Sequence, residues 1–308
     1  MSDPRIGLVL GGGGARGFAH IPVIEALDEL GLVPAAIAGT SIGAIMGASR
    51  GSGLTGREIR ERTLEVFGNR AAALGKLWDL RPRRFADILA PGGLALGQLD
   101  AERILSVFVG DAIAPTFADL VIPTAIVATD FYASGEIALR SGDLRKAVAA
   151  SIALPVVFRP VLHDGRVLID GGVHNPVPVD HVPDGLDFVI AVDVIGQPEP
   201  VDGKALPGAL ETIFGASQIL MQAVAKGKFE KRPPDLLIRP AVSGFRVLDF
   251  LRAREILEAT DATKDEVKRR LERLIAAHPA EPVALPPPKP KAAGRLRRTR
   301  AVTTGHEA

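Results

Sequence analysis

The sequence predicts an α/β fold of three layers, α/β/α, around a mostly parallel central sheet. Ile6–Leu10 is a short apolar run that ends in four glycines, which is typical of a buried parallel strand entering a tight loop. Apolar side chains then repeat at helical spacing over residues 21–30, with acidic residues on the other face. A second apolar run, over residues 35–38, leads through a turn into a helix of small residues from residue 44. A strand, helix, strand and helix in this order are typical of α/β proteins.

The rest of the chain continues with helical and extended patterns. Helices are predicted over residues 57–67, 144–153 and 210–226, and strands over residues 121–128, 136–140, 167–170, 188–194 and 236–239. A last helix carries Val267, Leu271, Leu274 and Ile275 at the i, i+4, i+7, i+8 spacing of one buried face. No internal repeat is visible in the sequence.

Charge is unevenly distributed along the chain. Its 308 residues include 37 Lys or Arg and 36 Asp or Glu, a formal net charge of +1. From residue 280 onward, six basic and two acidic residues give +4, which leaves −3 for the preceding part. This last stretch is rich in proline and arginine and has little to bury. We therefore expect one domain over residues 5–279, with its motifs in about 5–200 and C-terminal helices in 201–279, followed by a disordered tail over 280–308.

The composition excludes several classes of protein. The chain has no cysteine, which rules out a disulfide-stapled module, a thiol nucleophile, an iron–sulfur centre and a Cys-ligated zinc site. The nearly balanced charge argues against a nucleic-acid-binding protein. The first residues lack a secretory signal, and the longest uncharged apolar stretches, 120–129 and 147–158, are too short to span a membrane. We expect a soluble, cytoplasmic protein that can still touch a membrane surface.

A glycine-rich loop over residues 11–17, GGGGARG, lies between the first predicted strand and the first predicted helix. Its backbone N–H groups can approach an anion closely because glycine has no Cβ, and the helix N-terminus adds positive potential. Three anions fit such a loop: a dinucleotide pyrophosphate, a nucleotide phosphate, or the oxyanion of a tetrahedral intermediate. A tight turn without any ligand is the fourth interpretation.

The residues after the glycine loop weaken both nucleotide interpretations. A dinucleotide site calls for an acidic residue about 20 positions further on, where this chain has Gly39-Thr40-Ser41. A P-loop calls for Lys and then Ser or Thr after the last glycine, where this chain has Phe18-Ala19. The oxyanion is therefore the favoured ligand of the loop.

A G-x-S-x-G sequence, from Gly39 to Gly43, falls at the turn between the second predicted strand and the next helix. Its glycines let the backbone turn sharply enough to expose the hydroxyl of Ser41 as a nucleophile. A second G-x-S-x-G, around Ser49, has no strand before it and lies inside the predicted helix. Ser41 is therefore the candidate, and Ser49 is not.

A serine nucleophile needs a general base, most often a histidine. The six histidines do not fit the order of an α/β-hydrolase, in which serine, acid and histidine follow one another after several strands. His174 is the one histidine that competes for the role, four residues after Asp170. A surface or loop position is the favoured interpretation for it.

Asp170 is the candidate base, at the end of the predicted strand 167–170 and before Gly171 and Gly172. A carboxylate at the carboxyl end of a strand, where α/β sheets gather their ligand sites, can accept the serine proton directly. The Asp-Gly pair is also a common turn sequence. Asp130 and Asp193 end apolar runs as well, but no glycine follows them directly to make room for a serine and a substrate.

These motifs together resemble the patatin-like phospholipase family, and most of all its short bacterial members. The glycine loop with Arg16, the elbow at Ser41 and the D-G-G at Asp170 occur in the family's order, with 27 residues from Gly14 to Ser41 and 129 from Ser41 to Asp170. Residues 150–155, ASIALP, resemble the family's A-S-x-x-x-P block, and residues 175–178, NPVP, resemble the segment after its D-G-G or D-G-A. The resemblance covers about residues 5–200.

The resemblance implies the patatin fold and a Ser-Asp dyad that hydrolyses acyl esters of lipids through an acyl-enzyme intermediate, without a metal or other cofactor. Ser41 would be the nucleophile and Asp170 its general base. The residues of the oxyanion hole and substrate site would be Gly12, Gly13, Gly14, Arg16 and Gly17, and the glycines that support the elbow and the dyad would be Gly39, Gly43, Gly171 and Gly172. The substrate would be a phospholipid, a lysophospholipid or a related acyl ester.

Other interpretations stay open at the level of sequence. A regulatory or binding protein that keeps this fold without useful turnover is one alternative, and a nucleotide-binding Rossmann protein is another. The basic tail is either a solvated terminus without function or a polybasic segment that adds about 1 kcal/mol per basic residue near an anionic membrane. The head group, the acyl-chain length and the oligomeric state are not specified by the sequence.

Overall fold

A computed structural model describes residues 4–69, 75, 99–200 and 206–277. The described residues form one eight-stranded sheet. Five neighbouring strands run parallel: β3 (Thr124–Asp130), β2 (Ala36–Thr40), β1 (Ile6–Leu10), β7 (Phe188–Val192) and β8 (Leu236–Ile238). Three more, β4 (Gly135–Leu139), β6 (Arg166–Asp170) and β5 (Val161–His163), add an antiparallel edge. The order is β5-β6-β3-β2-β1-β7-β8, with β4 paired to β3.

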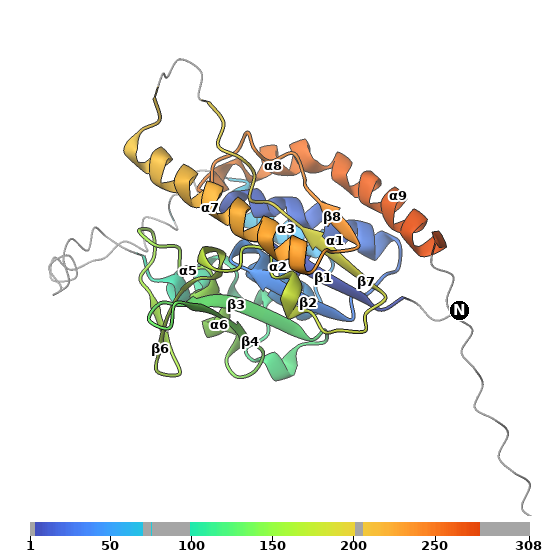
Figure 1. The fold of residues 1–308 in the computed structure, drawn as a ribbon, viewed down its shortest axis with the longest axis horizontal. Helices are drawn as coiled ribbons and strands as arrows, with labels where there is room; N and C mark the ends of the chain where they lie inside the picture. Colours follow the sequence, from blue (N-terminus) through green and yellow to red (C-terminus); the bar gives the residue numbers. More distant parts are fainter. Residues whose placement is uncertain (1–3, 70–74, 76–98, 201–205, 278–308) are drawn as a thin grey trace, which may run out of the picture.

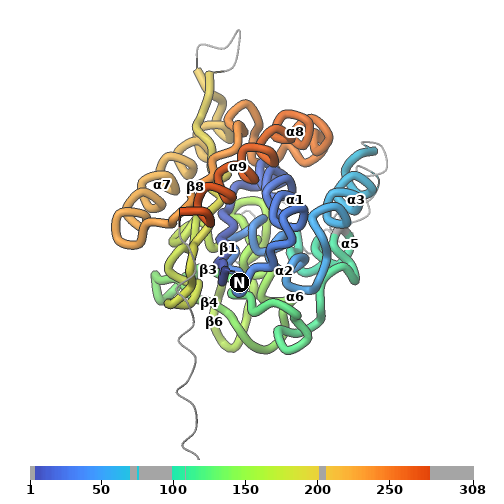
Figure 2. Tube along the Cα trace, turned by 90° about the vertical axis from the view of Figure 1, so that its right-hand side faces the viewer, coloured from blue at the N-terminus to red at the C-terminus, as the bar shows by residue number. Residues whose placement is uncertain are grey.

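Helices cover both faces of this sheet (Figures 1 and 2). One face carries α1 (His20–Glu29), α2 (Ile42–Gly51) and α6 (Leu144–Ser151), with α3 (Gly56–Phe67), α5 (Ala101–Phe108), α8 (Ala253–Thr260) and α9 (Ala262–Ala277) packed around them. The long helix α7 (Ala209–Lys231) crosses the other face. Short 3-10 helices connect these elements: η1 (Gly14–Ala19), η3 (Gly110–Ala112), η4 (Phe117–Asp119), η5 (Gly171–Val173), η6 (Val179–His181) and η7 (Phe250–Arg252). The predicted three-layer α/β/α arrangement with a mostly parallel sheet is confirmed.

Side chains of the central strands alternate between two apolar layers. In β1, Leu8 and Leu10 pack in the cluster that contains α1, α8 and α9, whereas Val9 packs in the cluster that contains Ala225 and Met221 of α7. All three β1 side chains are fully buried. A strand covered on both faces needs apolar residues at every position, which is why its sequence reads as a continuous apolar run.

β2 and β6 lie on the same side of β3 and point toward each other. β2 runs parallel to β3 and places Thr40 opposite Val127, whereas β6 runs antiparallel and places Asp170 opposite Ala128. Because Val127 and Ala128 are consecutive, the carboxyl ends of β2 and β6 meet head to head beside β3. The mixed pairing of β3 therefore brings Ser41, the residue after β2, next to Asp170, although 129 residues separate them in sequence.

The structure differs from the sequence prediction mainly at element boundaries. β3 starts and ends two to three residues later than the predicted strand 121–128, and α7 extends five residues beyond the predicted helix 210–226. The helix α5 and the strand β5 were not predicted; β5 ends in a histidine and lacks the continuous apolar run that indicated the equally short β8. None of the helices in the described part of the chain combines the length and the apolar character that a membrane span needs. The tail, 280–308, lies outside the described residues, so its disorder stays a prediction.

Candidate active site

Ser41 occupies the sharp turn between β2 and α2, with φ = 55° and ψ = −122°. A positive φ is costly for a residue with a Cβ, so neighbouring contacts must maintain it. Two glycines make the turn compact: a Cβ on Gly39 would collide with the carbonyl oxygen of Gly43, and a Cβ on Gly43 would collide with that of Leu10. The N-terminus of α2 consequently lies directly against the end of β1, and Ser41 stands at the carboxyl edge of the sheet.

The Ser41 hydroxyl donates a hydrogen bond of 2.6 Å to Oδ2 of Asp170. The other carboxylate oxygen, Oδ1, accepts the N–H of Gly172 at 2.7 Å. Asp170 is only 4% exposed, and this burial raises its pKa to about 6, although the hydrogen bonds from Ser41 and Gly172 act in the opposite direction. A carboxylate in contact with a serine hydroxyl, with a pKa close to neutral pH, is suited to accept its proton.

A second buried serine, Ser151 at the end of α6, holds the main chain of Ser41. Its Oγ accepts the Ser41 N–H at 2.9 Å and donates to the carbonyl oxygen of Val127 at 2.6 Å. Ser151 is fully buried, so this hydroxyl ties the turn at Ser41 to the middle of β3. The sequence placed Ser151 in the ASIALP block, residues 150–155, without assigning it a role.

The glycine loop passes beside the nucleophile. A Cβ on Gly12 would lie 3.3 Å from the Cβ of Ser41, and a Cβ on Gly17 would collide with the side chain of Ile42. Gly14 has a φ of +60°, which glycine adopts without steric cost. The loop therefore reaches Ser41 only because side chains are absent on its inner surface.

The N–H groups of the glycine loop are not all engaged. Gly12 donates to the carbonyl oxygen of Pro176 at 2.8 Å, and Ala15 donates to that of Val247 at 2.9 Å. None of the hydrogen bonds found among the described residues uses the N–H of Gly13 or Gly14 as its donor. The N–H of Gly12 is thus occupied, whereas the N–H groups of Gly13 and Gly14 have no hydrogen-bond acceptor among the described residues.

Arg16 controls the orientation of one of these free N–H groups. Its Nε donates to the carbonyl oxygen of Gly13 at 3.1 Å. That carbonyl belongs to the same peptide group as the N–H of Gly14. In a trans peptide the C=O and N–H point in opposite directions, so the bond from Arg16 to the carbonyl also fixes the direction of the Gly14 N–H. Burial lowers the pKa of Arg16 to about 10, while the charges of Asp193 and Asp249 act to raise it. The guanidinium thus stays charged at neutral pH.

His20 supports the start of the loop from α1. It is completely buried, and its Nε2 lies 2.8 Å from the carbonyl oxygen of Gly11. Burial lowers the pKa of His20 to about 4, against the opposing effect of that hydrogen bond. The ring is therefore neutral at neutral pH and donates its Nε2–H to Gly11.

The remaining glycines of the predicted site lie around the carboxylate. A Cβ on Gly171 would collide with the carbonyl oxygen of Val127, so the turn after β6 packs directly on β3. A Cβ on Gly172 would lie 3.0 Å from both Asp170 Oδ1 and the Met221 methyl of α7. The two glycines therefore let the Asp170 turn fit between β3 and α7.

The competing residues lie elsewhere. Asp130 binds Arg166 at 2.9 Å, and Asp193 binds Arg239 at 3.0 Å. Nδ1 of His174 lies 3.5 Å from a carboxylate oxygen of Glu136, not in the hydrogen bond that Ser41 makes with Asp170. Ser49 lies within α2 and is buried.

One group of metal-ligand type occurs in the described residues: Glu136, Asp180 and His181, whose ligand atoms lie within 4.8 Å of one another. The ammonium of Lys228 lies 2.9 Å from Glu136 and 2.6 Å from Asp180. A protein cation therefore already pairs with both carboxylates.

The described residues define an α/β protein with a serine on a strand-to-helix turn, a buried aspartate beside it and a glycine loop with free N–H groups. The model of the patatin-like phospholipase family matches residues 8–183, more than half of the chain. The chain belongs to the patatin-like phospholipase family.

Individual relatives match the part of the chain that carries the motifs. An uncharacterized NTE family protein of Mycobacterium tuberculosis is 40% identical over 198 residues, which cover 64% of this chain and 51% of that protein. Patatin-like phospholipase domain-containing protein 6 of Homo sapiens is 34% identical over 202 residues, 65% of this chain and 14% of that protein. The chain thus matches about half the length of the mycobacterial relative. The crystal structure of VipD from Legionella pneumophila aligns with 90% of this chain and 67% of its own, with 17% identity and a TM-score of 0.46.

Proposed function

We propose that this chain is a serine hydrolase that cleaves acyl esters of lipids, as a lysophospholipase, a phospholipase A or a related carboxylesterase. The observation that carries the proposal is the 2.6 Å hydrogen bond from Ser41 to the buried carboxylate of Asp170. The free N–H groups of Gly13 and Gly14 support it, because ester hydrolysis needs a site for an oxyanion beside the nucleophile. Membership of the patatin-like phospholipase family supports a lipid as the acyl donor.

In the acylation step, Oγ of Ser41 attacks the carbonyl carbon of the ester while its proton passes to Oδ2 of Asp170. The carbonyl oxygen becomes negatively charged and is stabilised by the N–H groups of Gly13 and Gly14. One such donor commonly lowers the barrier by ~3 to 4 kcal/mol. The bond to the leaving oxygen then breaks, and Asp170 returns the proton to the departing alcohol. The acyl group stays on Ser41.

In the deacylation step, a water molecule attacks the acyl carbon and gives its proton to Asp170. The same two N–H groups stabilise the second oxyanion. When the bond between the acyl carbon and Oγ breaks, the proton passes from Asp170 to Ser41, and the fatty acid leaves. The enzyme returns to its initial state without a histidine or a metal in any step.

A fluorophosphonate probe tests this proposal, because it labels only an activated serine. We expect the probe to label Ser41, and we expect Ser41→Ala and Asp170→Asn each to abolish labelling and ester hydrolysis. Ser49→Ala, in the other G-x-S-x-G, is the matched control and keeps both. Full activity in either dyad variant would exclude the dyad. An unreactive Ser41 in folded wild-type protein would favour a regulatory or binding role.

A separate hydrolysis screen would define the substrate of the active enzyme. It compares lysophospholipids, diacyl phospholipids and p-nitrophenyl esters.

We further propose that the six basic residues of 280–308 draw the protein to anionic lipid, at the inner face of the membrane. These residues lie outside the described part of the chain, and their charge alone supports the proposal. Liposome sedimentation of the full chain and of a chain ending at residue 279 tests it. Equal binding of the two proteins at low salt would identify the tail as a solvated terminus.

A further inference from the structure

Asn175 and Pro176 touch all three segments that carry the candidate site. The N–H of Asn175 donates to the carbonyl oxygen of Gly171 at 2.8 Å. Its carbonyl oxygen accepts the hydroxyl of Thr40, also at 2.8 Å. The carbonyl oxygen of Pro176 accepts the N–H of Gly12 at 2.8 Å. Two consecutive residues therefore connect the glycine loop, the last residue of β2 and the turn after β6.

Each of these bonds ends one residue away from a group that takes part in the proposed reaction. Nucleophile, base and oxyanion donors come from three different segments, and they must agree in position to a fraction of an ångström for efficient catalysis. The neighbouring pairs are Thr40 and Ser41, Gly171 and Asp170, and Gly12 and Gly13. The connection is therefore placed where it can set the mutual geometry of the three groups without touching the substrate.

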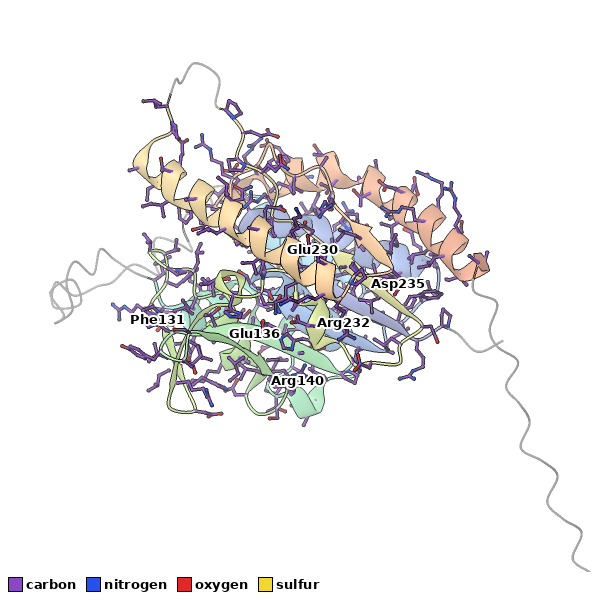
Figure 3. The ribbon with its side chains drawn as sticks, viewed as in Figure 1. Phe131, Glu136, Arg140, Glu230, Arg232 and Asp235 are labelled. Atoms are coloured by element: carbon purple, nitrogen blue, oxygen red, sulfur yellow. The ribbon has the colours of Figure 1, made fainter. Side chains whose placement is uncertain are left out.

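The side chain of Asn175 is held by a residue outside the three segments that its main chain connects. It is fully buried, and its Nδ2 donates to Oδ1 of Asp180 at 2.7 Å. The other oxygen of Asp180 accepts the ammonium of Lys228 at 2.6 Å, and the same ammonium donates to Glu136 at 2.9 and 3.1 Å. Glu136 projects from β4 toward α7, which supplies the lysine (Figure 3). The amide is thus anchored to an ion cluster that links β4, η6 and α7.

Asparagine suits this position because the partly buried carboxylate of Asp180 needs a hydrogen-bond donor and not another acid. Burial alone would raise the pKa of Asp180, but hydrogen bonds from Lys228 and Asn175 outweigh it and lower the pKa. Asp180 therefore stays ionised and holds the amide firmly, since hydrogen bonds to a charged group are stronger than neutral ones.

We propose that Asn175 is a positioning residue, which aligns the oxyanion loop, Ser41 and Asp170 and is itself held by Asp180 and Lys228. The inference rests on the proposed function for its catalytic consequence, but the alignment is a property of the fold. It predicts that variants of this connection lower kcat and leave KM nearly unchanged, because misalignment of the reacting groups weakens the transition state and not substrate binding.

Thr40→Val is the mildest test, because valine keeps the shape of threonine and removes only the hydroxyl that binds Asn175. With a soluble p-nitrophenyl ester, we expect kcat to fall about fivefold and KM to change less than about twofold. Thr124→Val is the matched control. Thr124 is also a buried strand threonine, and its hydroxyl donates to a main-chain carbonyl, that of Ile122, at 2.9 Å. We expect Thr124→Val to keep the wild-type kcat.

Asn175→Asp is the stronger test, because it places an acceptor against the carboxylate of Asp180. We expect kcat to fall roughly 100-fold or more with little change in KM. We also expect faster amide hydrogen exchange at Gly12, whose N–H bond to Pro176 loses its support. If Asn175→Asp does not fold, Thr40→Val and Thr124→Val decide the question.

Wild-type kcat in folded Asn175→Asp, or equal kcat in Thr40→Val and Thr124→Val, would overturn the inference. A change in KM alone would do the same, because it indicates a role in binding. Amide hydrogen exchange at Gly12 tests the alignment independently of catalysis, so a failure of this inference can be told apart from a failure of the proposed function. If the wild-type protein shows no esterase activity, slow exchange at Gly12 in wild type and fast exchange in Asn175→Asp still support the alignment, and equal exchange contradicts it.

Discussion

Ser41 donates its hydroxyl to Asp170 at 2.6 Å, and the two residues reach each other because β2 and β6 end head to head beside β3. The carboxylate receives one further hydrogen bond, from Gly172, and is otherwise shielded from water. Water and donors would stabilise the charged form, so their scarcity makes Asp170 a stronger base than an exposed aspartate. The same residue therefore orients the serine hydroxyl and has the pKa that the proposed role of general base requires.

The first prediction concerns pH. Asp170 accepts a proton only when it is ionised, and burial raises its pKa to about 6. The rate of fluorophosphonate labelling at Ser41 should therefore rise with pH up to about 6 and level off above it. An exposed aspartate would place this limb near pH 4. Labelling rates between about pH 3.5 and 8.5 distinguish the two, and a limb near pH 4 would contradict the assignment of Asp170 as the base.

The second prediction concerns the stability cost of this base. A pKa that is higher in the folded state means that ionisation of Asp170 destabilises the fold, increasingly as pH rises from about 4 to about 6, and fully above that. A rise in the pKa from the ordinary value of an aspartate to about 6 corresponds to ~3 kcal/mol. Asp170→Asn removes the buried charge, so we expect a gain of about 1 to 3 kcal/mol in the free energy of unfolding at pH 8, together with loss of activity.

Urea unfolding of wild type and Asp170→Asn at pH 8 and pH 4 measures this gain. The difference between the two proteins should shrink at pH 4, because Asp170 is then almost fully protonated in the folded state and the folded protein no longer carries the buried charge. A variant that is less stable than wild type at pH 8 would show that the Asp170 charge is net stabilising.

The third prediction concerns Ser151. Ser151→Ala removes the acceptor of the Ser41 N–H and the donor to the Val127 carbonyl, and both groups are then buried without a partner. We expect a loss of about 1 to 3 kcal/mol in stability and about tenfold in kcat, because the positive φ of Ser41 depends on this contact. Chemical denaturation and ester hydrolysis measure the two effects. Ser49→Ala, another buried helical serine, is the control; an equal effect on kcat there would disprove a specific role of Ser151.

The fourth prediction concerns the compactness of the serine turn. A Cβ on Gly43 would collide with the main-chain carbonyl of Leu10, which cannot move without disturbing β1. Gly43→Ala should therefore destabilise the fold by about 3 kcal/mol or more. Gly227→Ala is the contrasting substitution, because Gly227 lies within α7 with open space around it. It should stabilise the protein by about 0.5 to 1 kcal/mol, and thermal unfolding of both variants gives the comparison.

Several elements were predictable because their patterns are local. Ile6–Leu10 and Phe188–Val192 are buried on both faces and therefore read as apolar runs, and α1 and α9 show one apolar face at helical spacing. The antiparallel pairing of β6 and β4 with β3 was not predicted. Strand pairing is a contact between segments distant in sequence, so neither the periodicity nor the composition of one segment predicts its partner.

The candidate site shows the same division. Glycines around Ser41, the four glycines after β1 and the glycines after Asp170 are short-range signals, because each is needed for a local turn or a close approach of backbone. These motifs were sufficient to indicate the family, and the match over residues 8–183 confirmed it. Ser151 and Asn175 lie in the segments 150–155 and 175–178 that contributed to the resemblance, but their hydrogen bonds to the site could not be predicted, because their partners are distant in sequence. Lys228 carries no such signal, since a lysine in a helix is unremarkable on a surface.

The sequence alone therefore specified the elements of a three-layer α/β fold, the serine turn, the glycine loop and the family resemblance, because these depend on residues close together in the chain. Tertiary structure decided that β2 and β6 meet beside β3 and that Asp170 is buried enough to raise its pKa. It also decided that the N–H of Gly12 binds Pro176, whereas those of Gly13 and Gly14 find no acceptor within the described part of the chain. These properties arise from the pairing of strands and the exclusion of water, which bring together residues as far apart in sequence as Ser41 and Asp170, 129 residues. They exist only once the chain has folded.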